Sequence, residues 1–269
     1  MSKKRVLYVT QEMSPYTALT EISGILNQLA PHVYNKGLEV RVLMPRYGVI
    51  NERRHRLHEV VRLSGMNIIV DDDDFPLIIK VASLPGSRMQ VYFLDNEEFF
   101  KRKYIFDDED GTPFEDNADR MVFFCKGVME TVKKFGWAPD IIHCNGWMTS
   151  LVPMYHQKLY KSDPIFQDAA MIYSVGSNSY ADTFSTDFFA KAMINDLEEA
   201  DLADYRNGDA ITLHEGAIKH ADGIIVGSES LPPSVQDAVD ATDKPKLTHD
   251  NEEFLAQYIE FYNSFIEEE

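Results

Sequence analysis

Short, uninterrupted runs of apolar residues alternate with helical patterns along this chain. The first run is residues 6–9 and the second is residues 40–44. Such runs are typical of strands buried on both faces of a parallel sheet. Between them, apolar residues recur at helical spacing from Ile22 to Val33, and Gly37 follows where a C-cap glycine is expected. These residues therefore predict a complete βαβ unit.

The same alternation continues to residue 226. Strands are expected at 60–61, 68–70, 77–79, 91–94, 139–144, 170–175 and 223–226, and helices at about 117–135, 148–160 and 212–220. The four aspartates at 71–74 fit a solvated hairpin turn better than a cation site, because consecutive side chains do not converge on one ion. The expected fold is α/β, a doubly wound, mostly parallel, Rossmann-like sheet.

The length of 269 residues fits one large domain, since a chain of this size buries about three quarters of its unfolded surface. We expect residues 1–239 to form that domain, and residues 240–269 to form a polar linker and an amphipathic helix packed on it. The apolar stripe of this helix consists of Phe254, Leu255, Tyr258, Ile259, Tyr262, Phe265 and Ile266. Packing on the domain is favoured over a partner site, because exposed apolar stripes of this size are costly.

Charge and cysteine content narrow the classes of function. The chain has 44 acidic and 26 basic side chains and a net charge of -18, which repels polyanions and disfavours nucleic acid and anionic membranes as partners. A basic protein partner stays open. No apolar run approaches the roughly 18 residues of a membrane span. Two cysteines are too few for a disulfide-built secreted fold, so we expect a cytoplasmic protein.

Common catalytic motifs are absent from the sequence. The chain has no dinucleotide Gly-x-Gly-x-x-Gly turn after its first strand, no P-loop, no His-Glu-x-x-His and no zinc-spaced cysteine pair. The sequence therefore predicts neither a cofactor nor a metal. Adjacent His143 and Cys144 would point to opposite faces of a strand, so they are interpreted as core residues and not as a thiol catalyst.

Ligands of open α/β sheets bind outside the carboxyl ends of the strands. The loops expected there contain aromatic and polar residues that could stack on a sugar ring and hydrogen-bond its hydroxyls. These candidates are Glu12, Tyr16, Asp95, Asn96, Asn145, Trp147, Ser177, Asn178 and Tyr180. The alternative is that such residues only cap helices and turns, which is common for asparagine and serine.

Four segments resemble the N-terminal half of bacterial glycogen synthases and plant starch synthases. They are residues 39–48, 91–96, 116–120 and 139–144, and the similarity extends to about residue 235. These enzymes have the GT-B fold and transfer glucose from a nucleotide-glucose donor. The resemblance implies a single domain of the GT-B N-terminal type, whose partner domain in the family binds most of the donor nucleotide.

The sequence departs from this family where the chemistry is expected. The family's Lys-x-Gly-Gly-Leu, which approaches the donor diphosphate, reads Ala-Leu-Thr-Glu-Ile at residues 18–22. A carboxylate thus stands where phosphate needs amide donors. The family's active-site histidine in His-Asp-Trp-His is Asn145, which cannot ionise. Its Thr-Ile-His-Asn reads Ser-Val-Gly-Ser at residues 174–177.

Two functions are compatible with these observations. The first is a stand-alone glycogen synthase-like domain with no catalytic residues of its own, which binds an α-glucan, a sugar nucleotide or a protein partner of storage-polysaccharide metabolism. The second is a glucosyltransferase, active alone or as one subunit of a split glycogen synthase. A second chain would restore the donor domain but not the missing lysine and histidine.

Overall fold

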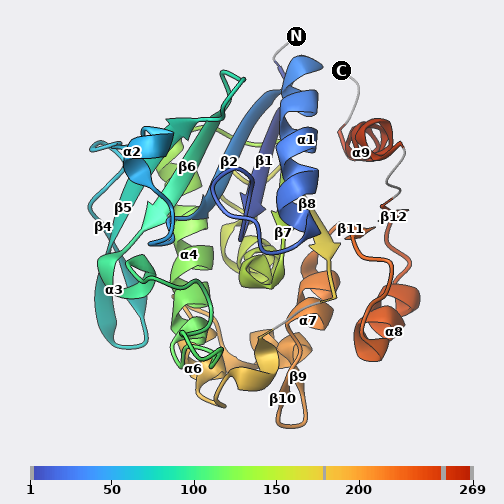
Figure 1. Cartoon of the computed structure of the whole chain (residues 1–269). Coiled ribbons are helices and arrows are strands. Elements are labelled where there is room, and N and C mark those ends of the chain that lie inside the picture. Colours follow the sequence, from blue (N-terminus) through green and yellow to red (C-terminus); the bar gives the residue numbers. More distant parts are fainter. Residues whose placement is uncertain (1–2, 178–179, 250–252, 267–269) are drawn as a thin grey trace.

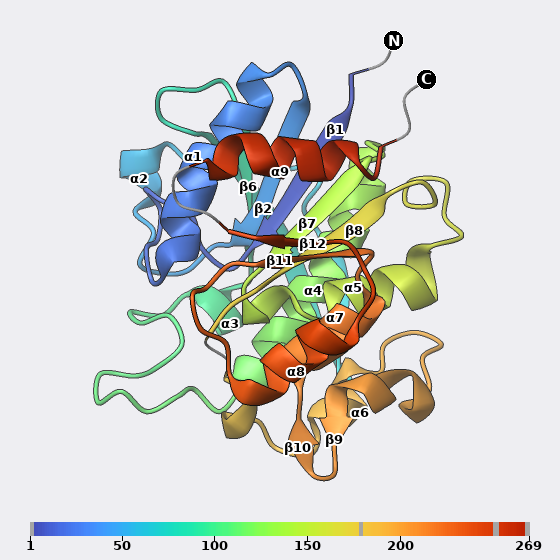
Figure 2. The ribbon, with the colours of Figure 1, turned by 90° about the vertical axis from the view of Figure 1, so that its right-hand side faces the viewer.

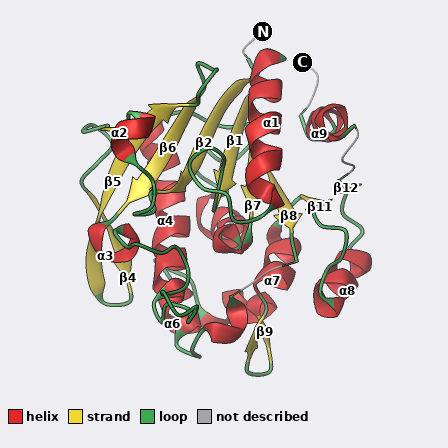
Figure 3. Ribbon diagram, in the orientation of Figure 1, coloured by secondary structure: helices red, strands yellow, loops and turns green. Residues whose placement is uncertain are grey.

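The computed structural model describes residues 3–177, 180–249 and 253–266. One sheet dominates this part of the chain (Figures 1 and 3). Its parallel strands are β1 (Arg5–Thr10), β2 (Glu39–Pro45), β6 (Gln90–Asp95), β7 (Ile141–Asn145), β8 (Ala170–Val175), β11 (Gly223–Val226) and β12 (Lys246–Thr248). The antiparallel strands β3 (His58–Glu59), β4 (Met66–Val70) and β5 (Asp73–Ser83) follow at one edge. The order is β12-β11-β8-β7-β1-β2-β6-β5-β3, with β4 paired to β5.

Helices cover both faces of the sheet. The helices with eight or more residues are α1 (Glu21–Asn35), α4 (Asn117–Phe135), α7 (Leu213–His220), α8 (Pro233–Ala241) and α9 (Phe254–Asn263). Shorter ones are α2 (Glu52–His55), α3 (Glu97–Phe100), α5 (Val152–Tyr155) and α6 (Phe188–Ala192), and β9 (Arg206–Asn207) pairs with β10 (Ala210–Ile211). Figure 2 shows the sheet from its β12 edge, with α1 and α9 on one side and α4, α5, α7 and α8 on the other. The predicted doubly wound, mostly parallel α/β sheet is confirmed.

Most expected elements are present. The first βαβ unit is confirmed, with Val6 opposite Val40 in parallel register. The acidic run forms the expected hairpin, although only Asp71 and Asp72 make the turn, because Asp73 already pairs with Val70. His143 and Cys144 are fully buried, as expected of core residues.

Two predicted elements are wrong. Residues 60–61 are not a strand: β3 ends at Glu59, and Val61 lies in a turn with 77% of its surface exposed. The helix expected at 148–160 is divided into a 3₁₀ turn (Trp147–Thr149), α5 and a π-helical turn (His156–Tyr160). Pro153 stands at the start of α5, and its missing N–H cannot continue a preceding helix.

The C-terminal segment is attached to the sheet at several points. Within the expected linker, residues 246–248 form β12, which extends the sheet in parallel register with β11. Beyond it, α9 packs on the sheet, where the Tyr262 hydroxyl lies 2.8 Å from His143 Nδ1 on β7. Within the described residues, no helix combines the length and the apolar character that crossing a membrane needs.

Candidate functional site

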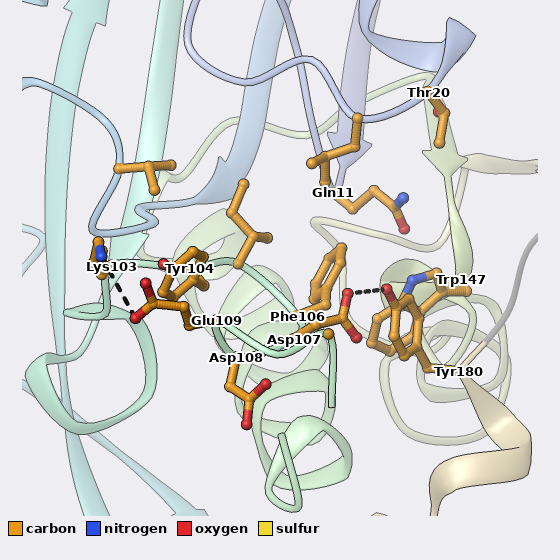
Figure 4. Close-up of a pocket in the computed structure, with 14 residues that line it drawn as sticks. Gln11, Thr20, Lys103, Tyr104, Phe106, Asp107, Asp108, Glu109, Trp147 and Tyr180 are labelled. Atoms are coloured by element: carbon orange, nitrogen blue, oxygen red, sulfur yellow. Dashed lines mark hydrogen bonds and ion pairs between the residues drawn. The ribbon is translucent and has the colours of Figure 1, made fainter. Parts of the chain in front are cut away.

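A cavity of about 580 Å³, named pocket 1 here, opens where β1 and β7 end (Figure 4). Gln11 follows β1 directly, and Trp147 lies two residues beyond β7. The wall opposite them is the loop at residues 103–111, between α3 and α4. The lining residues are Gln11, Leu19, Thr20, Val49, Lys103, Tyr104, Ile105, Phe106, Asp107, Asp108, Glu109, Gly111, Trp147 and Tyr180.

Three aromatic rings pack together at the base of pocket 1. The centroid of Trp147 is 4.9 Å from that of Phe106 and 5.1 Å from that of Tyr180. Trp147 is fully buried, so its ring faces are occupied by protein and not open to a sugar. Its indole Nε1, however, is buried without a hydrogen-bond partner among the described residues. Trp147 therefore holds an unsatisfied N–H donor at the edge of its ring, at the base of pocket 1.

Carboxylates form the polar side of pocket 1. The Tyr180 hydroxyl donates a 2.9 Å hydrogen bond to Asp107 Oδ2 (Figure 4). Burial, together with this carboxylate, raises the pKa of Tyr180 to about 12, so the phenol stays protonated at neutral pH. Asp108 Oδ1 accepts from the backbone amides of Asp110 and Thr112, at 2.9 Å each. Lys103 Nζ lies 3.9 Å from Glu109 Oε2 on the exposed rim.

Close backbone packing holds the loop at 103–111 in place. A Cβ atom on Gly48 would lie 2.1 Å from the carbonyl oxygen of Arg102, so only glycine fits there. Arg102 Nη1 donates to Asp116 Oδ1 at 2.7 Å, and Nδ2 of the Asn117 side chain donates to the Phe106 carbonyl at 2.9 Å. Pocket 1 is thus preformed by contacts outside its own lining.

Of the candidate residues predicted from the sequence, Trp147 and Tyr180 line pocket 1. Glu12 is fully buried and faces the loop before α1, where it accepts from the backbone amides of Leu19 (2.5 Å) and Thr20 (2.9 Å). It also accepts from the Thr20 hydroxyl at 2.5 Å. Glu12 therefore fixes the position of Leu19 and Thr20 on the rim and does not line the cavity.

Three further candidates have structural partners away from pocket 1. Asp95 Oδ2 accepts from Arg46 Nε at 3.0 Å and from Lys80 Nζ at 2.9 Å, and it is 2% exposed. Asn96 caps α3 by accepting from the amides of Glu98 and Phe99. Tyr16 packs edge-on against Phe93 and is 6% exposed, and burial raises its pKa to about 12.

Asn145 and Ser177 lie on the other side of the α1 N-terminus. Asn145 is 4% exposed, donates to the carbonyl of His143 at 3.1 Å, and lines a small cavity of about 10 Å³. Ser177 is exposed at a larger cavity of about 930 Å³, named pocket 2, which Glu21, Glu229, Asp240 and Lys246 also line. Asn178 lies outside the described residues. The candidate residues predicted from the sequence therefore do not form one site: some line pocket 1, Ser177 lines pocket 2, and others have structural partners elsewhere.

Sequence reasoning missed Gln11 and the loop at 103–109. The available signal was the combination of Tyr104 and Phe106 with the carboxylates that follow them. No fixed spacing marks such a loop, because its path depends on Gly48 and Asp116, which contact it from elsewhere in the chain.

Comparison with known proteins identifies the family. The profile of the starch synthase catalytic domain matches residues 5–240. The chain belongs to the starch synthase catalytic domain family. The glycogen synthase of Chlorobium limicola is 36% identical over 219 residues, which are 81% of this chain and 44% of that protein. The glycogen synthase of Chlorobaculum parvum is 37% identical over 232 residues, 86% of this chain and 47% of that protein.

A solved structure agrees on the fold. The catalytic domain of Starch Synthase IV from Arabidopsis thaliana, bound to ADP and acarbose, matches with a TM-score of 0.72 at 19% identity. The match covers 98% of this chain and 50% of that chain. The chain therefore spans about half the length of the relatives that it matches, and the resemblance inferred from the sequence is confirmed.

Proposed function

We propose that this starch synthase-type domain binds an α-glucan in pocket 1 and has no glucosyltransferase activity of its own. The observation that supports binding is the lining of pocket 1, where a phenol and an indole N–H face carboxylate and amide oxygens. Each sugar hydroxyl both donates and accepts a hydrogen bond, so such a mixed lining suits carbohydrate.

The proposal of inactivity rests on the side chains at the donor positions of the family. Ala18 and Asn145 replace the lysine and histidine that the family uses, so neither positive charge is available. Glu21 stands in the first turn of α1, where its carboxylate accepts from the Ser228 hydroxyl at 2.9 Å. A carboxylate at a helix N-terminus competes with phosphate for the same amides and dipole. Lowering a reaction barrier depends mainly on charged groups arranged to stabilise the transition state. In this chain the lysine and histidine that would supply such charges are replaced by Ala18 and Asn145.

Co-sedimentation with glycogen tests the binding. Tyr104→Ala removes a half-buried ring from the rim of pocket 1, and Tyr34→Ala removes a half-buried ring from α1, away from pocket 1. We expect Tyr104→Ala to weaken binding about five- to tenfold, the scale of one aromatic contact, while Tyr34→Ala binds like the wild type. Equal binding by all three proteins would remove pocket 1 from glucan recognition.

Trp147→Ala is a poor test because it empties a fully buried site, at a cost of about 3–5 kcal/mol. Trp147→Phe keeps a ring there and removes the N–H. We expect this variant to fold and to bind glycogen more weakly.

The second candidate is a glucosyltransferase, alone or with a second chain that supplies a donor-binding domain. It is supported by relatives such as those described above, which are named glycogen synthases and are about twice as long. Transfer of labelled glucose from ADP-glucose or UDP-glucose to glycogen tests it, with the purified protein and with added cell lysate. Incorporation that depends on this protein would overturn the proposal of inactivity.

A further inference from the structure

We propose that pocket 1 selects uncharged saccharides and rejects their phosphorylated counterparts, because the carboxylates of residues 107–109 line it. This selectivity rests on the proposed glucan binding and adds a ligand class that the site excludes. It depends on charge, on the hydrogen-bonding groups of the lining, and on the size of the cavity.

The charge of the lining is negative. Asp107, Asp108 and Glu109 contribute three carboxylates, whereas Lys103 is the one basic side chain among the lining residues. The ammonium of Lys103 lies 3.9 Å from Glu109, and both side chains are about three quarters exposed. Lys103 therefore points along the rim and offsets at most one of the three negative charges.

The size of pocket 1 makes this charge effective. A ligand in this cavity of about 580 Å³ lies next to the carboxylates that line it, and charges closer than the Debye length, roughly 10 Å at 0.1 M salt, interact with incomplete screening. A phosphate bound in pocket 1 is therefore repelled by these carboxylates, most strongly at low salt. An exposed surface site would screen the same charges more fully.

The hydrogen-bonding groups also favour a hydroxyl over a phosphate. The buried Nε1 of Trp147 has no partner among the described residues, and in Figure 4 it lies on the edge of the ring that faces Gln11. A phosphate needs several N–H donors or cations. A hydroxyl needs one donor and one acceptor, and Trp147 Nε1 and the Asp107 carboxylate can supply them.

The two tryptophans provide a local readout. The chain contains only Trp137 and Trp147, so a ¹⁵N-labelled sample gives two indole N–H signals. Trp137 Nε1 donates to Glu39 Oε2 at 2.9 Å and does not line pocket 1, which makes it an internal control. Trp147→Phe assigns the signals. Maltoheptaose and maltoheptaose with a single 6-phosphate are the two probes.

We expect maltoheptaose to shift the Trp147 signal and to leave the Trp137 signal in place. The phosphorylated probe should bind about tenfold more weakly at low salt, and the difference should shrink at 0.5 M salt because the carboxylates are then screened. In the variant Asp108→Asn/Glu109→Gln, the ratio of the two affinities should fall toward one. The matched control Asp110→Asn/Glu115→Gln removes the same charge from exposed positions outside the lining and should keep the wild-type ratio.

The outcomes separate the two proposals. Equal affinity for both probes at low salt, or the same change of ratio in both double variants, would overturn the selectivity and leave glucan binding standing. If neither probe shifts the Trp147 signal at millimolar concentration, glucan binding in pocket 1 is overturned, and the selectivity with it.

Discussion

Single residues at the carboxyl edge of the sheet have two kinds of role. Glu12 and Asn96 accept hydrogen bonds from backbone amides, and Asp95 pairs through its Oδ2 with Arg46 and Lys80, so these residues hold the loops in place. Trp147 and Tyr180 line a cavity and keep polar atoms near it. Substitution of the first group is expected to affect folding before binding, and substitution of the second group to affect binding.

Gly48→Ala tests how the loop at 103–111 is held. Its Cβ would overlap the backbone of Arg102, which cannot move away as a flexible side chain could. We expect the free energy of unfolding to fall by about 1–3 kcal/mol, as for overpacked sites. Chemical denaturation measures it.

Gly24→Ala is the matched control for Gly48→Ala. Gly24 lies inside α1 with open space where a Cβ would be, so the same substitution should stabilise by about 0.5–1 kcal/mol. Equal effects of the two substitutions would mean that the contact between Gly48 and Arg102 is unimportant.

Ala18→Lys/Glu21→Gly tests the reason given for the absence of transfer. The double variant restores a cation and removes a carboxylate at the N-terminus of α1, so affinity for ADP should rise at least about tenfold. Isothermal titration calorimetry with ADP measures the change. A variant that binds ADP no better than the wild type would show that other positions exclude the nucleotide.

At the scale of elements, α9 is joined to the sheet by buried polar groups as well as by its aromatic stripe. His143 Nε2 lies 2.7 Å from the Ser174 hydroxyl, while its Nδ1 lies 2.8 Å from that of Tyr262. The Tyr262 hydroxyl in turn donates to that of Tyr8 at 3.3 Å. Phe265 covers Gly223, where a Cβ would approach its ring to 2.5 Å. These contacts fix α9 over β1, β7 and β11.

Burial of His143 makes stability depend on pH. Desolvation lowers the pKa of His143 from 6.5 to about 3. Below pH 6.5 its imidazole is therefore protonated in the unfolded chain while it stays neutral in the folded protein. The contribution is complete above pH 6.5 and is lost as pH falls toward 3, at up to about 1.4 kcal/mol per pH unit. Urea unfolding of the wild type and of His143→Gln at pH 7, 6 and 5 measures it.

The variant isolates His143 from other groups that titrate in this range, including the buried His156, whose pKa desolvation also lowers. We expect a shallower pH dependence in His143→Gln than in the wild type. The same slope in both proteins would contradict a neutral His143 in the folded state.

At the scale of the whole molecule, the chain carries a net charge of -18. Like charges on a compact body repel one another, and salt screens that repulsion. Raising NaCl from 0.01 to 0.15 M should therefore raise Tm by a few degrees, which differential scanning fluorimetry can follow. A Tm that falls with added salt would indicate that ion pairs such as the one between Asp95 and Arg46 outweigh the repulsion.

The amino-acid sequence by itself determined the architecture and the family. Runs such as residues 6–9 and 40–44 are typical of strands buried on both faces of a parallel sheet, and the helical spacing between them indicates a βαβ connection. The buried core position of His143 also followed from local pattern. The predicted strand at 60–61 was wrong, because β-propensity does not ensure that a segment pairs with another strand. The predicted continuous helix at 148–160 was also wrong, because Pro153 interrupts it.

Only the tertiary structure decided which polar residues face a ligand. Asp95 and Tyr180 are equally good candidates in the sequence. In the structure Asp95 pairs with Arg46 and Lys80, whereas Tyr180 lines pocket 1. Trp147 reaches pocket 1 with its ring faces buried and its N–H unpartnered among the described residues. The direction of a side chain and the partners it meets come from segments distant in the chain, and local sequence patterns hold no information about them.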